Sequence, residues 1–206
     1  MHDSLIRGDV AAMPEMSLFL ETERLKLRPF WLQDKDIAVE LFTDPAVTRY
    51  VYGNAFSYDE ILEQLPLETR RGAGGRLGIW CAMRRDTGEK VGTGVLLPLP
   101  IDTDDTDWSS LVPDRYPEGE VEVGYMLKRE AWGNGYATEI CRALLRFGFE
   151  QTALDEIKAT VDPDNVASHR VLRKCGMEHE GLRRAYATTC DGYGITRRQW
   201  ERLGRT

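Results

Sequence analysis

The sequence predicts an α/β fold built on a mixed, mostly antiparallel sheet that is flanked by helices. Residues 121–127 alternate apolar with polar or small side chains, the period of a strand with one buried face. Residues 137–145 place apolar side chains at helical spacing, and residues 157–161 form a second strand. A strand–helix–strand series of this length implies a parallel pair joined by a right-handed crossover. The hairpins described below supply antiparallel pairs.

The first part of the chain predicts a tail followed by one strand. Residues 1–17 have no usable periodicity, so we expect a flexible N-terminal tail. A single domain is expected over residues 18–206, because a chain of 206 residues fits one domain and no linker divides it. Leu25 and Leu27 alternate with charged residues, which predicts a half-buried strand that ends at Pro29.

Two helices and a hairpin are expected next. Apolar spacing predicts a helix over residues 34–42, and Asp44-Pro45 interrupts it because the residue before proline avoids helical backbone. Ser57-Tyr58-Asp59-Glu60 reads as a capping box that opens a second helix through about residue 70, with Pro66 as a kink or break. Residues 77–83 and 91–97 predict antiparallel strands joined through Asp86-Thr87-Gly88.

The segment 98–119 is bounded by proline and rich in aspartate, at Asp102, Asp104, Asp105 and Asp107. We expect a solvated acidic loop. The alternative is an acidic lip that gathers cationic substrates, because long loops often carry function.

The stretch Trp132-Gly133-Asn134-Gly135-Tyr136-Ala137-Thr138-Glu139 lies between a strand and a helix. This layout presents unpaired N–H groups at a helix N-terminus, where aligned peptide dipoles add about half a positive charge. Gly133 and Gly135 let the main chain turn tightly and approach an anion closely. The pattern favours a phosphate or pyrophosphate site, although it lacks the lysine of a P-loop and the third glycine of a Rossmann fingerprint. A glycine turn that binds nothing is the alternative.

The last third predicts a strand, a short helix and a hairpin. Asn165 is expected to cap a helix that ends near Gly176. Residues 178–203 alternate weakly around Cys190-Asp191-Gly192, which suggests a closing hairpin.

Composition narrows the class of protein. The net charge of −7 argues against a nucleic-acid surface. No apolar run approaches the ~20 residues that span a bilayer, and the first residues lack a signal-peptide pattern, so a cytoplasmic location is expected.

The cysteines are widely spaced, which favours buried thiols over a metal site or disulfides. They are Cys81, Cys141, Cys175 and Cys190.

Six motifs in chain order carry a family resemblance. They are ETERLKLRP at 21–29, DP at 44–45 followed by VTRY at 47–50, GEKVG at 88–92, EVGY at 122–125, WGNGYATE at 132–139, and NVAS at 165–168 followed by LRKCGM at 172–177. From about Leu18 to Trp200 the chain thereby resembles the GNAT superfamily of N-acetyltransferases, in the ribosomal-protein alanine N-acetyltransferase (RimJ/RimL) branch.

The resemblance implies a fold, a donor and a set of contacts. The GNAT-like sheet would have one splayed parallel strand pair and helices on both faces, and acetyl-CoA would donate its acetyl group to an attacking amine. Backbone groups near Met126, Leu127 and Arg129 would pair with the pantetheine arm, and an amide near Met126 would polarise the thioester carbonyl. Asn165 would also bond the pantetheine, and Ser168 would lie near the sulfur. The amides of Gly133, Asn134, Gly135, Tyr136, Ala137 and Thr138 would hold the pyrophosphate, and Trp132 is also expected to bind the cofactor.

Two residues depart from the wider superfamily. Trp132 replaces glutamine or arginine, although tryptophan is usual in this branch. Leu172 replaces the tyrosine that many members use as general acid, and leucine cannot donate a proton. Ser168 is the candidate that orients or protonates the leaving thiolate; the alternative is a helix-surface serine.

Glu122 is the candidate general base, because strand alternation places it on the face opposite Val121 and Val123. The alternative is a solvated or salt-bridged strand residue. His169 is expected to be exposed. An α-amine of pKa near 7.8 needs about 1.1 kcal/mol to lose its proton at pH 7, whereas a lysine-like amine needs about 4.6 kcal/mol.

The sequence therefore predicts an acetyl-CoA-dependent N-acetyltransferase whose leading acceptor is a protein N-terminal α-amine. A small-molecule amine, such as an antibiotic or polyamine, is the alternative acceptor. A CoA-binding module without turnover is the alternative class. We expect neither nucleic acid nor membrane as partner, and a homodimer is compatible with the sequence.

Overall fold

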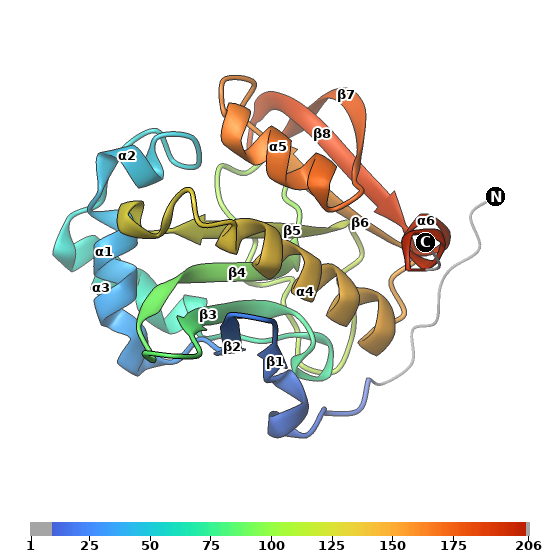
Figure 1. The fold of residues 1–206 in the computed structure, drawn as a ribbon, viewed down its shortest axis with the longest axis horizontal. Helices are drawn as coiled ribbons and strands as arrows, with labels where there is room; N and C mark the ends of the chain where they lie inside the picture. Colours follow the sequence, from blue (N-terminus) through green and yellow to red (C-terminus); the bar gives the residue numbers. More distant parts are fainter. Residues whose placement is uncertain (1–9, 205–206) are drawn as a thin grey trace.

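One mixed eight-stranded sheet forms the centre of the computed structural model, which describes residues 10–204 (Figure 1). The strand order is β1-β2-β3-β4-β5-β6-β8-β7, and β5 and β6 are the one parallel pair in the described chain. The strands are β1 (Leu20–Glu21), β2 (Leu25–Pro29), β3 (Gly78–Arg84), β4 (Lys90–Pro98), β5 (Val121–Leu127), β6 (Glu156–Val161), β7 (Glu178–Ala185) and β8 (Thr188–Thr196). The mostly antiparallel sheet is confirmed.

Six α-helices accompany the sheet within the described residues. They are α1 (Lys35–Phe42), α2 (Pro45–Thr48), α3 (Tyr58–Glu68), α4 (Tyr136–Gln151), α5 (Val166–Lys174) and α6 (Arg197–Leu203). Short 3-10 turns are η1 (Glu15–Leu18), η2 (Leu32–Asp34), η3 (Ala73–Gly75) and η4 (Arg129–Ala131). No helix in the part of the chain that the structure describes is long and apolar enough to cross a membrane.

Helices cover both faces of the sheet, as two adjacent residues of β3 show. Trp80 packs on Phe147 of α4 with ring centroids 5.4 Å apart. Cys81 faces the other way, where burial and the charge of Asp34, next to α1, raise the pKa of its thiol to about 12. All four cysteines are buried free thiols, as expected. The sheet therefore has an α4 face and an α1 face.

Asp34 joins the start of α1 to two strands. Its side chain is fully buried and accepts hydrogen bonds from both Arg28 guanidinium nitrogens at 2.6 and 2.7 Å, and from the Trp31 N–H at 2.9 Å. Lys90 of β4 places its Nζ 2.9 Å from the same carboxylate. Burial alone would raise the pKa of Asp34, but these partners outweigh it and lower the pKa.

Most expected elements are present, including the strand ending at Pro29, the helix over 34–42 and the β3–β4 hairpin. The capping box at Ser57 and Glu60 is also present. Pro66 does not break its helix, since α3 runs on to Glu68.

The tail expected at residues 1–17 falls partly outside the described residues. Within its described part, the Val10 N–H donates to the Asp114 carbonyl at 2.6 Å. The Met13 N–H donates to the Gly74 carbonyl at 2.7 Å, and η1 follows. Contact with the rest of the protein therefore begins before Leu18.

The closing hairpin has its turn in a different place from the one expected. Cys190-Asp191-Gly192 lies inside β8, and Tyr186 and Ala187 form the turn with φ of 50° and 54°. An Asp-Gly pair is a strong turn signal, whereas nothing in the sequence marks a Tyr-Ala pair as a turn with left-handed backbone. After β8 the chain forms α6, which starts from a capping box of Thr196 and Gln199.

We expect Asp34→Ala to lower the free energy of unfolding by about 3 kcal/mol, because it leaves the half-buried cations of Arg28 and Lys90 without their buried partner. The pKa of Asp34 is lower in the folded state than in the unfolded state. Its contribution to the free energy of unfolding is therefore complete above the unfolded-state pKa and is lost as the pH falls through the folded-state pKa. Urea unfolding at pH 7 and pH 3 measures both effects. Asp36→Ala is the control: it removes the exposed partner of Lys90 and should cost less than about 1 kcal/mol. Equal losses for the two variants would contradict the assignment.

Candidate active site

The parallel strands β5 and β6 meet at one registered pair, Glu122 with Lys158, and then separate. β4 pairs with β5 along its whole length, from Val121 to Leu127. The edge of β5 beyond Glu122 is therefore open toward β6, and α4 and α5 lie beside this opening (Figure 1). The splayed pair implied by the family resemblance is confirmed.

A fixed loop leads from β5 into α4. Gly133 and Gly135 have φ of 74° and 81°, the left-handed backbone that glycine adopts readily. The Trp132 indole N–H donates to the Leu127 carbonyl at 2.8 Å. The Asn134 side-chain amide donates to the Ala131 and Trp132 carbonyls at 3.2 and 3.0 Å. These side-chain hydrogen bonds to backbone carbonyls fix the conformation of the loop.

Five consecutive N–H groups, from Gly133 to Ala137, find no acceptor among residues 10–204. The next amide differs, because the Thr138 N–H donates to the Gly135 carbonyl at 3.1 Å. A Cβ built on Gly133 would meet nothing within 4 Å, so no side chain blocks this point. Free donors at the start of the 16-residue helix α4 are suited to an anion.

Glu139 connects the start of α4 to the turn between β1 and β2. Its carboxylate accepts from the Thr22 hydroxyl at 2.7 Å and from Arg24 Nε at 2.5 Å. The Arg24 guanidinium also lies 4.9 Å from the centre of the Tyr136 ring. Burial would raise the pKa of Glu139, but these hydrogen bonds lower it and keep the carboxylate charged.

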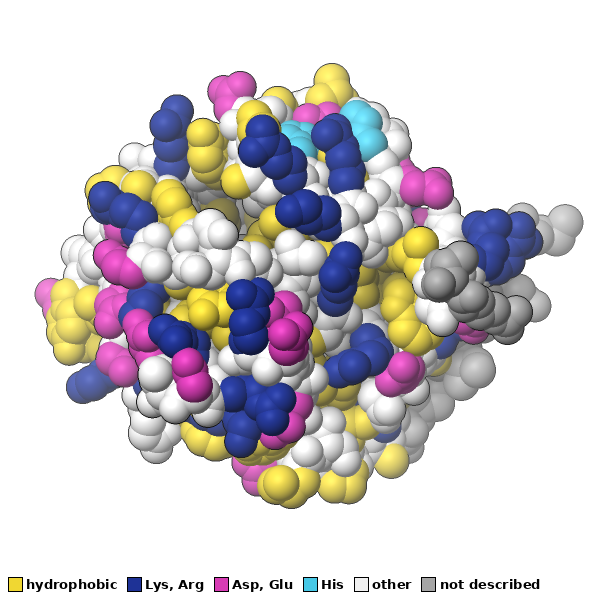
Figure 2. Space-filling model, viewed as in Figure 1, with side chains coloured by type: hydrophobic (Ala, Val, Ile, Leu, Met, Phe, Trp, Pro, Cys, Tyr) yellow, Lys and Arg dark blue, Asp and Glu magenta, His cyan; other side chains and the backbone are white. Residues whose placement is uncertain are grey.

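Lys and Arg side chains gather on the surface over α4 and α5 (Figure 2). Arg142, Arg170, Arg173 and Lys174 are exposed there. Arg142 also donates to the Lys174 carbonyl at 2.7 Å, which joins the two helices. This positive surface and the free amides lie on the same side of the sheet, and both suit a phosphorylated ligand.

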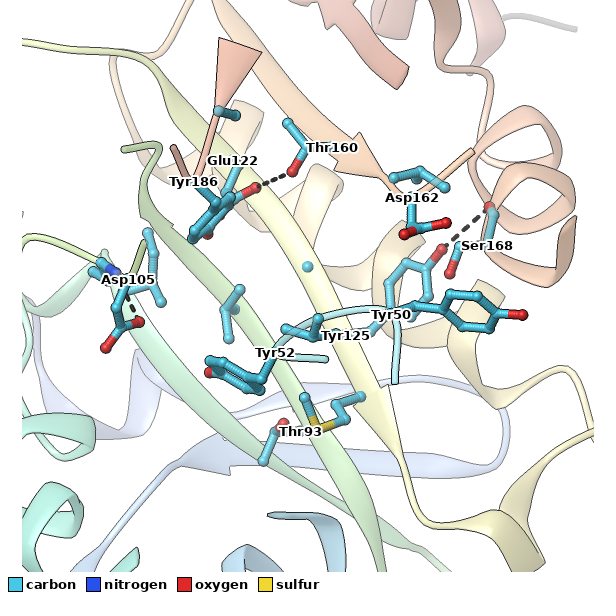
Figure 3. A pocket seen from close by; sticks show the side chains of 18 of the residues that line it. Tyr50, Tyr52, Thr93, Asp105, Glu122, Tyr125, Thr160, Asp162, Ser168 and Tyr186 are labelled. Carbon is cyan, nitrogen blue, oxygen red and sulfur yellow. Dashed lines mark hydrogen bonds between the residues drawn. The ribbon is translucent and has the colours of Figure 1, made fainter. Parts of the chain in front are cut away.

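A cavity of about 430 Å³ lies at the α1 face of the sheet and reaches α5. The surface is hollowed between α5 and the segment that follows α2, residues 49–53, and both contribute to the cavity wall (Figure 2). The cross-strand pairs Leu97–Glu122 and Val95–Gly124 put Glu122 on the cavity side of β5. Figure 3 shows Glu122 with Thr160 and Tyr186 at one wall.

Glu122 is 5 % exposed. The Thr160 hydroxyl donates to one carboxylate oxygen at 3.3 Å, and the Tyr186 hydroxyl donates to the other. Burial raises the pKa of Glu122 to about 8, against the lowering effects of the Thr160 hydrogen bond and the Arg183 charge. The alternative of a solvated or salt-bridged strand residue is wrong, and the predicted orientation relative to Val121 and Val123 agrees with the register.

α5 contributes two of the expected residues to the cavity. The Asn165 Oδ1 accepts from the Ser168 N–H at 3.1 Å, so the expected cap is present. The Tyr125 hydroxyl donates to the Ser168 carbonyl at 3.4 Å across the strand opening. Asn165, Ser168 and Met126 all line the cavity. The prediction that His169 is exposed is wrong. The Tyr193 hydroxyl lies 2.8 Å from its Nδ1, and the Tyr193 side chain covers the ring.

Three other expected residues lie outside the cavity wall. Neither Leu127 nor Trp132 lines the cavity, and the Trp132 indole N–H donates to the Leu127 carbonyl. The Arg129 side chain pairs with Asp44 at 2.7 Å and so joins η4 to the start of α2. Only the backbone groups of Arg129 are therefore available for the role that the resemblance implies.

The cavity is acidic. Its wall carries five carboxylates and one guanidinium, from Glu60, Glu68, Asp105, Glu122, Asp162 and Arg49. Burial and the Asp105 charge raise the pKa of Glu68 to about 7. Of the four aspartates clustered at 102–107, only Asp105 lines the cavity, and the other three are exposed. The loop is thus mostly solvated, with one aspartate placed as the acidic-lip alternative expects.

Free amides on one side of the strand opening suit a phosphorylated ligand, and the acidic cavity on the other side suits a cationic one. The chain belongs to the GNAT acetyltransferase family: the model of the acetyltransferase (GNAT) domain matches residues 24–178. It is an acetyl-CoA-dependent acetyltransferase, and the five free amides fit the diphosphate of that donor.

Known proteins support this assignment. The uncharacterized protein YkkB of Bacillus subtilis is 33% identical over 163 residues, 78% of this chain and 85% of its own length. The FsC-acetyl coenzyme A-N(2)-transacetylase of Aspergillus fumigatus is 30% identical over 194 residues, 89% of this chain and 78% of its own. A solved structure of the aminoglycoside acetyltransferase AAC(6')-Ib in complex with coenzyme A has the same fold, with a TM-score of 0.67 and 20% identity, covering 88% of this chain and 99% of that one.

We expect Gly133→Ala to weaken CoA binding at least about tenfold, because a side chain in left-handed backbone displaces the free amides. Gly88→Ala is the matched control, since Gly88 has φ of 73° and nothing near its Cβ position. Both variants should lose about 1–2 kcal/mol of unfolding free energy. Calorimetric titration with CoA separates them, and equal CoA affinities would contradict the role of the loop.

Proposed function

We propose that this enzyme acetylates a primary amine that binds in the acidic cavity, with Glu122 as the general base. The observation that carries the proposal is the position of Glu122: it is buried in the cavity wall, at the last point where β5 still pairs with β6. A base at this point lies beside the opening that connects the cavity with the α4 side.

The residues act in a simple order. The cavity carboxylates attract the protonated amine, and Glu122 in its ionised form accepts the proton. Bound acetyl-CoA supplies the thioester that the neutral amine attacks: a C–N bond forms, the C–S bond breaks, and CoA leaves as the thiol with the second proton lost by the amine nitrogen. The amides of Gly133 to Ala137 would hold the diphosphate of the donor, and Ser168 and Tyr125 border the opening between the two sides.

The pKa of the acceptor amine favours an α-amine, because any one base takes a proton from an α-amine at a lower cost than from a lysine-like amine. A base with a pKa of about 8 takes a proton from an amine of pKa near 7.8 at almost no cost. Transfer from a lysine-like amine costs about 3 kcal/mol, from a difference of about 2.4 pKa units. This supports a protein N-terminus as the leading acceptor, in keeping with the ribosomal-protein branch that the sequence motifs resemble.

A small cationic amine is the second candidate. The wall has five acidic side chains and one guanidinium, which favours an acceptor with more than one positive charge. The name of one protein with the same fold, the aminoglycoside acetyltransferase, specifies a small molecule.

We expect Glu122→Gln to lower kcat at least about 100-fold and to abolish its rise with pH. In the wild type the proton-accepting form of Glu122 appears as the pH increases, so kcat should rise with a midpoint near pH 8. The rate is measured at saturating amine, so that ionisation of the free amine does not enter. Glu63→Gln, at an exposed site on α3, is the control. Equal rates for wild type and Glu122→Gln from pH 6 to 9 would remove Glu122 as the base.

Thiol release from acetyl-CoA with a panel of amines tests the acceptor. We expect a peptide with a free N-terminus to react faster than the same peptide with a blocked N-terminus and one lysine. A polyamine that outperforms both would favour the second candidate. Tight CoA binding with no amine-dependent thiol release would instead indicate a binding module.

A further inference from the structure

The turn between β7 and β8 adopts a backbone that its residues disfavour. Tyr186 and Ala187 have φ of 50° and 54°, although neither is glycine or asparagine. Such a two-residue turn needs left-handed backbone at both positions, where glycine and asparagine are usual. Persistent left-handed backbone at ordinary residues occurs where surrounding contacts enforce it, often at functional sites.

Contacts with the loop after β4 enforce this turn. The Tyr186 N–H donates to the Pro100 carbonyl at 3.1 Å, and the Ala187 N–H donates to the Ile101 carbonyl at 3.0 Å. Two ion pairs connect β7 with the same loop: Arg184 with Asp102 at 2.7 Å, and Arg183 with Glu120. Leu99, Ala185 and Cys190 form a small buried cluster against which Tyr186 packs.

The turn directs the Tyr186 ring into the cavity, where its hydroxyl meets Glu122 (Figure 3). Thr160 holds the second carboxylate oxygen, so both oxygens have a donor. A carboxylate held at both oxygens has a fixed plane.

Few other charged groups act on Glu122. Arg183 of β7 is the nearby cation that favours its ionised form. Lys158, its register partner on β6, is instead paired with Glu156 and Glu180. Among the described residues, Cys190 of β8 and Tyr52 after α2 have pKa values that the charge of Glu122 also raises.

We infer that Tyr186 is a positioning residue, which the β7–β8 turn holds against Glu122 so that the carboxylate faces the acceptor amine. This inference rests on the proposed role of Glu122 as base. The hydroxyl also favours the ionised carboxylate, because a hydrogen bond to a charged group stabilises that charge. It therefore opposes the effect of burial on this group.

Tyr186→Phe tests the inference, because it removes the hydroxyl and keeps the ring. We expect the midpoint of the pH dependence of kcat to rise by about one pH unit, the effect of one hydrogen bond to a charged group. The KM for acetyl-CoA should not change. Tyr58→Phe is the control: Tyr58 is 50 % exposed on α3 and should leave the midpoint unchanged.

A second readout does not depend on turnover. Carbon NMR of protein labelled at the glutamate carboxyl groups gives the titration of Glu122, whose signal is assigned by its loss in Glu122→Gln. In Tyr186→Phe this titration should also move up by about one pH unit. An unchanged Glu122 titration in a folded Tyr186→Phe protein would overturn the inference. Failure of the base proposal gives a different result: Glu122→Gln would keep the wild-type kcat, while the Glu122 titration would still respond to Tyr186→Phe.

Discussion

The separation of two parallel strands after one registered pair determines the geometry of this site. Glu122 and Lys158 are the last residues that β5 and β6 share, and β4 alone holds β5 from there on. The strand edge that opens is bordered by Tyr125 and by Ser168 of α5. Under the proposed mechanism, ligands bound on opposite faces of the sheet would meet at this opening.

The charges differ on the two sides of that opening. Cationic side chains and free amides lie with α4 and α5, and carboxylates line the cavity at the α1 face. A phosphorylated donor and a cationic acceptor would therefore be attracted to different faces, and each face disfavours the other reactant. The net charge of −7 gives no sign of this division, because it averages over both faces.

Local patterns in the sequence predict the sheet, the glycine loop and the caps at Ser57 and Asn165, because each depends on neighbouring residues. The contacts of Glu122 depend on distant residues, and Thr160 and Tyr186 carry no local signal. The Asp-Gly pair at 191–192 also suggests the wrong turn, since contacts with the β4 loop, rather than residue preference, hold Tyr186 and Ala187 in the turn. Strand alternation does predict which face Glu122 occupies.

A crystal structure with bound CoA tests the account most directly. The account predicts diphosphate oxygens within hydrogen-bonding distance of the amides from Gly133 to Ala137, and a pantetheine arm that passes between β5 and β6 toward Glu122. A diphosphate bound elsewhere, with those five amides facing only solvent, would contradict it.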